Sequence, residues 1–202
     1  MKRSMLALTL ALTCGLASAA AVVGQPAPAF SATDTSGKTV SLADFKGRHV
    51  VLEWVNPGCP YVVKHYGAGN MQATQKSAVD KGVVWLSINS TATDATDYKT
   101  PASMAAWMVS QKASSSATLI DSEGKVGRAY GARATPHLYI IDPAGKLAYA
   151  GAIDSKASSN PADIAGATNY VKQALTESMA GKPISAPSTR PYGCSVKYSS
   201  GA

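Results

Sequence analysis

Short apolar segments alternate along the chain with amphipathic segments, and glycine or proline residues separate most of them. Runs of β-branched and aromatic residues bounded by turn residues are typical of β-strands. The nearly continuous apolar run at residues 83–88 is typical of a buried central strand. This pattern predicts strands at residues 30–33, 39–42, 49–55, 83–88, 118–120, 137–142 and 147–151.

Helical spacing is found between these predicted strands. Helices are expected from Pro60, from about residue 70 to 80, from 101 to about 112, and briefly before Tyr130. A last helix is expected to begin at Asp163 and to end before Gly181. Its apolar face would consist of Ile164, Ala167, Val171, Leu175 and Met179.

The order of the elements predicts the fold class. A strand–helix–strand unit is followed by another helix, a β-hairpin and a terminal helix, and a small hairpin at residues 30–42 precedes them all. Such an order is typical of an α/β protein with a mixed central sheet and helices on both faces.

The first residues have the layout of a secretory signal. A basic start at Lys2 and Arg3 precedes an apolar run too short to span a bilayer, and the small residues Ala17–Ala19 follow. We expect cleavage after Ala19, which would remove Cys14; the alternative is lipidation of Cys14. The chain then divides into a signal peptide (1–19), one domain (20–182) and a C-terminal extension (183–202) that is rich in Ser, Pro and Gly.

Charge and composition narrow the function classes. The full chain has a net charge of +7, but its basic residues are scattered and form no run or aromatic-basic stripe, so nucleic-acid binding has no support. No other apolar stretch is long enough to cross or anchor in a membrane. We therefore expect an exported protein, periplasmic or secreted, in a compartment where disulfides persist.

Cys59 lies at the expected boundary between a strand and a helix, between Gly58 and Pro60. Proline is favoured in the first turn of a helix, and the N–H groups and dipole of that turn favour an anion. Cysteines in this position have pKa values of roughly 3.5–7.5 instead of about 8.5, which makes the thiolate available as a nucleophile. The alternative is that Cys59 is a small buried apolar residue.

Two segments carry a resemblance to a known family. Residues 54–61 (WVNPGCPY) resemble the active-site segment of thioredoxin-like proteins, and Ala134–His137 (ATPH) resembles the loop with a cis-proline that faces the active cysteine. The resemblance covers about residues 24–180 and is closest to the peroxiredoxin-like branch of the redoxins. It implies a three-layer α/β/α fold, a cis peptide bond before Pro136, and backbone at Thr135 and Pro136 that pairs with substrate.

The sequence also departs from these family patterns. Val62 stands where a C-x-x-C motif has its second cysteine, and Asn56 stands where peroxiredoxins have Thr or Ser three residues before the reactive cysteine. Peroxiredoxins also have an arginine three residues before the aromatic residue of a later strand. The aromatic residue here is Tyr139, so Pro136 stands at the arginine position, and Arg128 or Arg133 is a candidate to replace that arginine. These departures place peroxide reduction in doubt.

Cys194 is the other cysteine of the expected mature chain. It is a candidate resolving cysteine that forms a disulfide with Cys59 during turnover. A permanent structural disulfide is a second interpretation, since closing a loop of this length contributes about 5 kcal/mol on the chain-entropy model. In a third interpretation the two thiols stay apart.

Two histidines are further candidates. His65 lies six residues after Cys59, so its side chain should point away from the sulfur and be exposed or partly buried. His137 follows the expected cis-proline and is assigned no role. Cys59, His137 and a methionine are a conceivable copper site, although a second cysteine ligand is missing. Trp54, Trp85 and Trp107 are expected in the core.

Three functions follow from these candidates. The first is a thiol-disulfide oxidoreductase in which Cys59 attacks a substrate sulfur and Cys194 resolves the adduct. The second is a thiol peroxidase, an antioxidant activity that would form a sulfenic acid on Cys59. The third is a non-enzymatic module that binds copper or a partner. The expected partners are protein or small-molecule thiols and disulfides, and hydroperoxides in the case of a peroxidase. A reductant is also expected, but the sequence does not identify it. No cofactor and no resident metal are expected.

Overall fold

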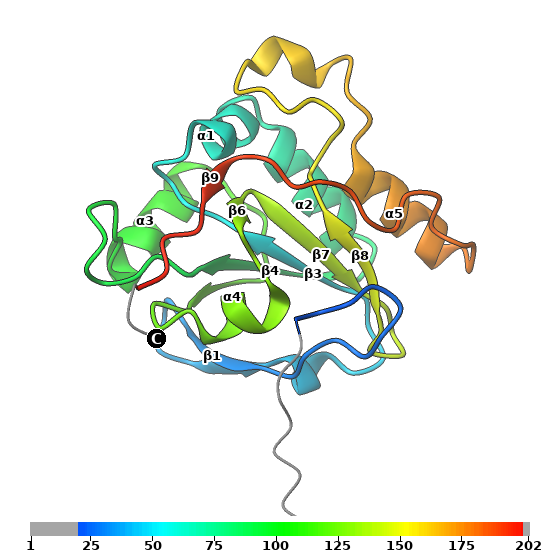
Figure 1. The fold of residues 1–202 in the computed structure, drawn as a ribbon, viewed down its shortest axis with the longest axis horizontal. Coiled ribbons are helices and arrows are strands. Elements are labelled where there is room, and N and C mark those ends of the chain that lie inside the picture. Colours follow the sequence, from blue (N-terminus) through cyan, green and yellow to red (C-terminus); the bar gives the residue numbers. More distant parts are fainter. Residues whose placement is uncertain (1–19, 200–202) are drawn as a thin grey trace, which may run out of the picture.

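The computed structural model describes residues 20–199, and its main feature is a mixed seven-stranded sheet in the order β2-β1-β5-β4-β3-β7-β8 (Figure 1). The strands β3, β4 and β5 are parallel to one another, whereas β7 and β1 run antiparallel to their neighbours. The strands are β1 (Ser31–Asp34), β2 (Thr39–Ser41), β3 (Val50–Trp54), β4 (Val84–Asn89), β5 (Ala117–Ile120), β7 (His137–Ile141) and β8 (Leu147–Gly151). The expected signal peptide and its Cys14 lie outside the described residues.

Helices cover both faces of this sheet (Figure 1). They are α1 (Pro60–Gly67), α2 (Asn70–Val79), α3 (Pro101–Ser110), α4 (Lys125–Tyr130) and α5 (Tyr170–Met179), with 3₁₀ turns η1 (Leu42–Phe45) and η2 (Pro161–Ile164). Apolar residues of α1, α2, α3 and α5 form one core, and those of α4 join a second core. The three-layer α/β/α fold with an added N-terminal β-hairpin is therefore confirmed.

The alternation of side chains along β3 explains the two cores. Val51 belongs to the core with α1 and α2, whereas Val50, Leu52 and Trp54 belong to the core with α4. Every residue of β3 and β4 is buried, as the apolar run at residues 83–88 predicted. Trp54 and Trp85 are fully buried, and Trp107 packs at the edge of the first core.

The prediction for the start of the last helix was wrong. The segment from Asp163 makes only the end of η2, and α5 begins at Tyr170. The side chain of Asn169 accepts a hydrogen bond from the backbone N–H of Lys172 and so forms the N-cap there. Val171 and Leu175 are buried as expected, but Met179 is exposed.

Residues 183–199, called the C-terminal strap below, cross the end of the molecule from α5 toward α4 (Figure 1). The strap first runs beside β8, where the Thr189 N–H donates to the Ala150 carbonyl and the Ala150 N–H donates to the Pro187 carbonyl. Its strand β9 (Cys194–Ser195) then pairs with β6 (Ala134–Thr135), and the Tyr198 hydroxyl donates to the Ala132 carbonyl. The extension is thus packed against the domain on both sides of Cys194.

The close approach of the strap to β8 yields a first prediction. A Cβ on Gly151 would collide with backbone and side-chain atoms of Thr189, whereas a Cβ on Gly166 would meet no atom within 4 Å. Gly151→Ala is expected to lower the free energy of unfolding by about 1–3 kcal/mol, because the two backbones would have to separate. Denaturant unfolding measures this loss, with Gly166→Ala as the matched control. Equal stability of the two variants would contradict the strap contact.

Candidate active site around Cys59

Cys59 is the N-cap residue of α1, directly after the turn that follows β3, and Pro60 is the first helical residue. The side chain of Asn56 holds this turn, since its Oδ1 accepts the Gly58 N–H at 2.9 Å and its Nδ2 donates to Asp97 Oδ2 at 2.7 Å. The Cys59 carbonyl accepts the first helical hydrogen bond, from Val63. The predicted position of Cys59 at the start of a helix is confirmed.

A disulfide joins Cys59 to Cys194, with 5.8 Å between their Cα atoms. Cys59 is 1% exposed, whereas Cys194 is half-buried. The interpretation in which the two sulfurs stay apart is therefore wrong. The pairing itself is common to the two remaining interpretations, a resolving cysteine and a structural disulfide.

The loop that precedes β7 faces Cys59. The peptide bond between Thr135 and Pro136 is cis, as the resemblance implied, and the Thr135 carbonyl oxygen is 3.0 Å from Cys59 Sγ. Thr135 pairs with Cys194 in the antiparallel β6–β9 ladder, and the Cys194 N–H donates to Cys59 Sγ at 3.4 Å. The backbone that was expected to pair with substrate is thus paired with the chain's own strap.

A polar cluster that the sequence did not predict lies beside the disulfide. The Tyr192 hydroxyl donates to Asp154 Oδ1 at 2.5 Å and lies 3.1 Å from His65 Nε2. Lys64 Nζ is 3.8 Å from Asp154 Oδ2, and the side chains of Lys64 and Asp154 are almost fully buried. No short motif links these residues, because they come from α1, from the segment after β8 and from the strap.

The prediction for His65 was wrong, because this side chain is completely buried. The His65 ring lies against Asp154 and Tyr192, whereas the prediction placed it in or near solvent. The pKa of His65 is lowered to about 4, mainly by burial; Asp154 opposes this shift and Lys64 adds to it. The ring is therefore neutral at pH 7.

Glu53 is a buried carboxyl group that the sequence analysis overlooked. It lies in β3 with no exposed surface and accepts hydrogen bonds from Tyr66, Gln75, Trp85 and Ser87. Burial raises its pKa, although these four donors oppose the shift. The sequence could have revealed this group, because Glu53 stands within the apolar run at residues 49–55. An ionisable residue in a buried strand needs hydrogen-bond partners.

His137 does not join Cys59. Its ring stacks on Tyr139, which belongs to the core with α4, whereas Cys59 belongs to the opposite core. Burial lowers the pKa of His137 to about 3. Within residues 20–199, no group of three or more His, Cys, Asp or Glu side chains could hold a metal ion.

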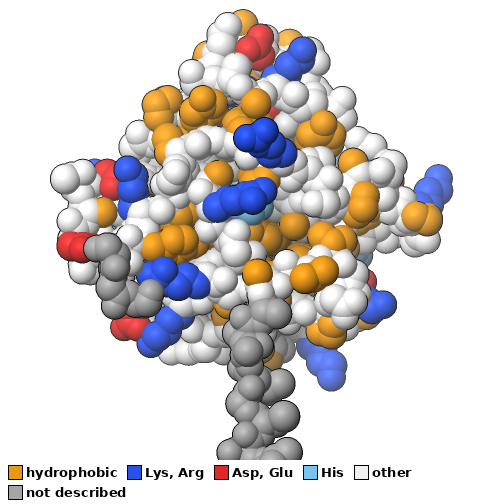
Figure 2. All heavy atoms as spheres, viewed as in Figure 1, with side chains coloured by type: hydrophobic (Ala, Val, Ile, Leu, Met, Phe, Trp, Pro, Cys, Tyr) orange, Lys and Arg blue, Asp and Glu red, His pale blue; other side chains and the backbone are white. Residues whose placement is uncertain are grey.

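The arginines that were considered as substitutes are both exposed. Arg128 donates to the Ser199 carbonyl, and its guanidinium lies 4.7 Å from the centre of the Tyr198 ring. The basic side chains visible in Figure 2 form several separate groups, some of them beside acidic side chains, which agrees with their scattered positions in the sequence.

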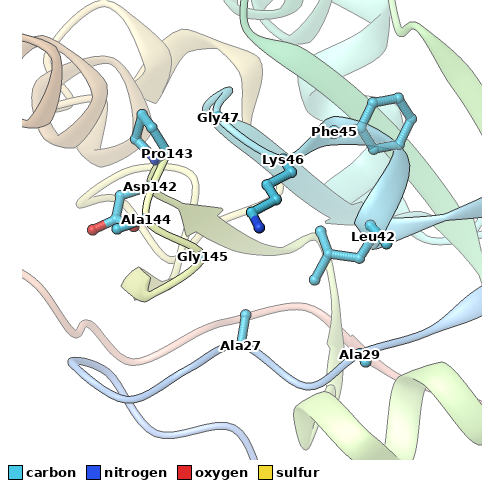
Figure 3. Close-up of a pocket in the computed structure, with 11 residues that line it drawn as sticks. Ala27, Ala29, Leu42, Phe45, Lys46, Gly47, Asp142, Pro143, Ala144 and Gly145 are labelled. Atoms are coloured by element: carbon cyan, nitrogen blue, oxygen red, sulfur yellow. The ribbon is translucent and has the colours of Figure 1, made fainter.

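A hollow at the opposite end of the sheet has a volume of about 380 Å³ (Figure 3). It lies between Leu42, Phe45 and the β7–β8 turn at Asp142–Gly145. Ile141 at this end of β7 pairs with Val50, while His137 pairs with Trp54 near Cys59. The hollow is therefore distant from the disulfide, and its lining is mainly apolar.

Comparisons with known proteins agree with this geometry. The model of the AhpC/TSA family matches residues 23–150. A hypothetical protein from Sinorhizobium meliloti 1021 has 23% identity and a TM-score of 0.76 over 91% of this chain and 98% of that one. An uncharacterized conserved protein from Geobacillus kaustophilus has 26% identity and a TM-score of 0.76 over 90% and 94%.

A thiol:disulfide interchange protein from Bacteroides sp. is similar at 24% identity and a TM-score of 0.51, over 63% of this chain and 79% of that one. No curated protein matches significantly. In the described part of the chain, no helix combines the length and apolar character needed to span a membrane. The family match and the topology of the sheet identify the fold as thioredoxin-like, and the similarity to the Bacteroides protein concerns the fold alone.

The long loop closed by the disulfide yields a stability prediction. Cys59→Ser and Cys194→Ser are each expected to lower the free energy of unfolding by about 5 kcal/mol, because the unfolded chain gains entropy when the cross-link is absent. Denaturant unfolding without reductant measures this, and the fully reduced native sequence is the control. If the reduced protein were as stable as the oxidised one, the cross-link would not constrain the chain.

The burial of His65 predicts acid sensitivity. The unfolded chain binds a proton at the ordinary histidine pKa of 6.5, whereas the folded protein does so only at about 4. Stability should therefore fall as the pH decreases from 6.5 to 4, by about 3 kcal/mol for this residue. His65→Gln should reduce that slope in denaturant unfolding at successive pH values, and the part due to His137 should remain. An unchanged slope would contradict a neutral, buried His65.

Proposed function

The chain belongs to the AhpC/TSA family, and on this basis we propose that it is a thiol-disulfide oxidoreductase that acts through the Cys59 thiolate. One observation supports the proposal most strongly. Cys59 is the N-cap of α1, faces the cis-proline loop and is joined to a cysteine on a separate segment. A sulfur in this position can alternate between a thiolate stabilised by the helix and a disulfide.

The reduced protein would begin the reaction. The Cys59 thiolate attacks one sulfur of a substrate disulfide, forms a mixed disulfide and releases the other sulfur as a thiolate. Cys194, as a thiolate, then attacks the Cys59 sulfur of the mixed disulfide, and the second substrate thiolate leaves. The products are two substrate thiols and the Cys59–Cys194 disulfide, so two electrons have passed to the substrate.

A dithiol reductant would complete the cycle. Cys59 is almost inaccessible in the oxidised form, whereas Cys194 is half-buried, so the incoming thiolate attacks Cys194. The bond to Cys59 breaks, and Cys59 departs as a thiolate. The second thiolate of the reductant then attacks the reductant sulfur of the mixed disulfide, which releases Cys194 as a thiolate and leaves the reductant oxidised. A thiol with a low pKa is a faster leaving group. The N-terminus of α1 would lower the pKa of the Cys59 thiol because it favours the thiolate.

The domain boundaries and the location belong to this proposal. Residues 1–19 would be removed as a signal, residues 20–182 would form the redox domain, and residues 183–202 would carry the second cysteine. A disulfide that persists between Cys59 and Cys194 is consistent with a periplasmic or secreted protein.

Peroxide reduction is the second candidate, and membership of the AhpC/TSA family is the observation that favours it. In this reaction a hydroperoxide would oxidise Cys59 to a sulfenic acid, and Cys194 would displace water to form the same disulfide. The amide of Asn56, however, already bonds to Gly58 and Asp97. Its hydrogen bonds support the turn, and disulfide exchange remains the preferred reaction.

The test uses the Cys194→Ser variant in a Cys14→Ser background, in which Cys59 is the one remaining cysteine. We expect the thiolate absorbance of Cys59 to titrate with a pKa below about 7.5. At pH 7 the variant should form a stable mixed disulfide with a disulfide substrate, detected by intact mass. The double variant Cys59→Ser/Cys194→Ser in the same background is the control and should form none.

Two results would contradict the proposal. A pKa near that of a free thiol, together with slow alkylation at neutral pH, would remove the reactive thiolate. Faster sulfenic acid formation with hydroperoxide than mixed-disulfide formation at equal concentrations would favour the peroxidase instead.

A further inference from the structure

The strap lies in the active site in the manner of a bound peptide. Its residues Cys194 and Ser195 form an antiparallel ladder with the cis-proline loop, and Cys194 is covalently joined to Cys59. Gly193 allows this approach, because a Cβ there would collide with the Thr135 carbonyl. The chain thus presents its own example of a polypeptide in mixed disulfide with the Cys59 sulfur.

Tyr192 supplies the main side-chain contact of this segment. Its ring packs edge-on against Tyr61, with the ring centres 5.7 Å apart, and its hydroxyl lies against His65 and Asp154, with Lys64 beside the ring. We call these three residues the tyrosine socket. Lys64 Nζ lies 5.7 Å from the centre of the Tyr192 ring and also donates to the Lys156 carbonyl.

The polar groups of the socket match a phenol. Asn70 donates to His65 Nδ1, so a neutral His65 carries its proton on Nε2 and donates it to the Tyr192 oxygen. The same hydroxyl donates its own proton to Asp154 Oδ1. A phenylalanine in this place would leave the Nε2–H group of His65 without an acceptor. It would also remove one of the two hydrogen bonds that Asp154 Oδ1 accepts, the other being from the Lys156 N–H. A buried donor without an acceptor is unfavourable.

Asp154 adds an independent indication of a site. Its second oxygen, Oδ2, is buried without a hydrogen-bond donor, and Lys64 and His65 each approach it only to 3.8 Å. A carboxylate that served the domain core alone would be expected to have both oxygens satisfied. Tyr192 bonds to Oδ1 and leaves Oδ2 unpaired, so Asp154 keeps a free acceptor beside the Tyr192 hydroxyl.

We propose that the tyrosine socket is a specificity site for polypeptide substrates that carry a tyrosine two residues before the reacting cysteine. The strap occupies the socket in the oxidised protein, and a substrate segment replaces it after reduction. This inference rests on the proposed oxidoreductase function and adds the substrate class to it. Selectivity arises because a site with buried hydrogen-bonding groups rejects an analogue that lacks the matching hydroxyl.

The experiment uses the full chain with Tyr192→Ala/Cys194→Ser, which empties the socket. Every variant also carries Cys14→Ser, so that Cys59 is the one remaining thiol. Three hexapeptides are compared: the sequence of residues 190–195 (RPYGCS), RPFGCS and RPAGCS, each with its cysteine in a disulfide with thionitrobenzoate. The Cys59 thiolate attacks the peptide sulfur, a Cys59–peptide disulfide forms, and thionitrobenzoate leaves with the electron pair. Its absorbance reports the rate.

The tyrosine peptide should react at least about tenfold faster than the phenylalanine peptide, as expected for a hydrogen bond to a charged group. Asp154→Ala in the same background should bring these two rates together. Asp80→Ala, which removes an exposed carboxylate at the C-cap of α2, is the matched control and should leave the ratio unchanged. If Asp154→Ala does not fold, Asp154→Asn should still lower the ratio, because the charge on the acceptor is lost.

A second comparison tests the competition by the strap. In Cys194→Ser alone the socket keeps Tyr192, so the preference for the tyrosine peptide should be smaller than in the double variant. Equal rates for the tyrosine and phenylalanine peptides in the double variant would overturn the specificity site and leave the oxidoreductase proposal intact. If neither the peptides nor a small aromatic disulfide reacted with Cys59, the oxidoreductase proposal itself would fail.

Discussion

The N-terminus of α1 favours an anion, and three parts of the chain converge on the sulfur of its N-cap residue, Cys59. Free N–H groups in the first turn of a helix need acceptors, and Pro60 removes one of these groups. The turn held by Asn56 presents Cys59 there, the cis-proline loop approaches the sulfur from β7, and the strap reaches it from the far end of the chain. Three distant segments therefore meet at one atom.

The position of Val62 explains why the second cysteine comes from the strap. In a C-x-x-C motif the partner would lie on the first turn of α1, but Val62 has no exposed surface and belongs to the apolar core. Cys194 approaches instead from the side of Thr135, along the backbone edge that a substrate would use. The second sulfur and a bound polypeptide thus occupy the same space, which links the redox state of Cys59 to the occupancy of the site.

Local patterns were sufficient for most of the fold. The strands were predictable because apolar runs between turn residues have few alternatives, and Cys59 was predictable because proline and glycine mark the start of a helix. The socket was not predictable, since Lys64, Asp154 and Tyr192 meet only through tertiary contacts. The start of the last helix was predicted wrongly at Asp163 for a local reason. Apolar residues keep helical spacing from Ile164 across Asn169, but Asn169 is the N-cap of α5.

The strap is held on both sides of Cys194, by Thr189 at β8 and by Tyr198 beside α4. Opening the disulfide therefore frees the middle of a segment whose two ends stay attached. Such a tethered thiol has an effective concentration in the millimolar range, far above that of most free thiols in solution. In the native chain, an adduct on Cys59 would accordingly have a short lifetime, and turnover would be limited by how fast the external reductant arrives.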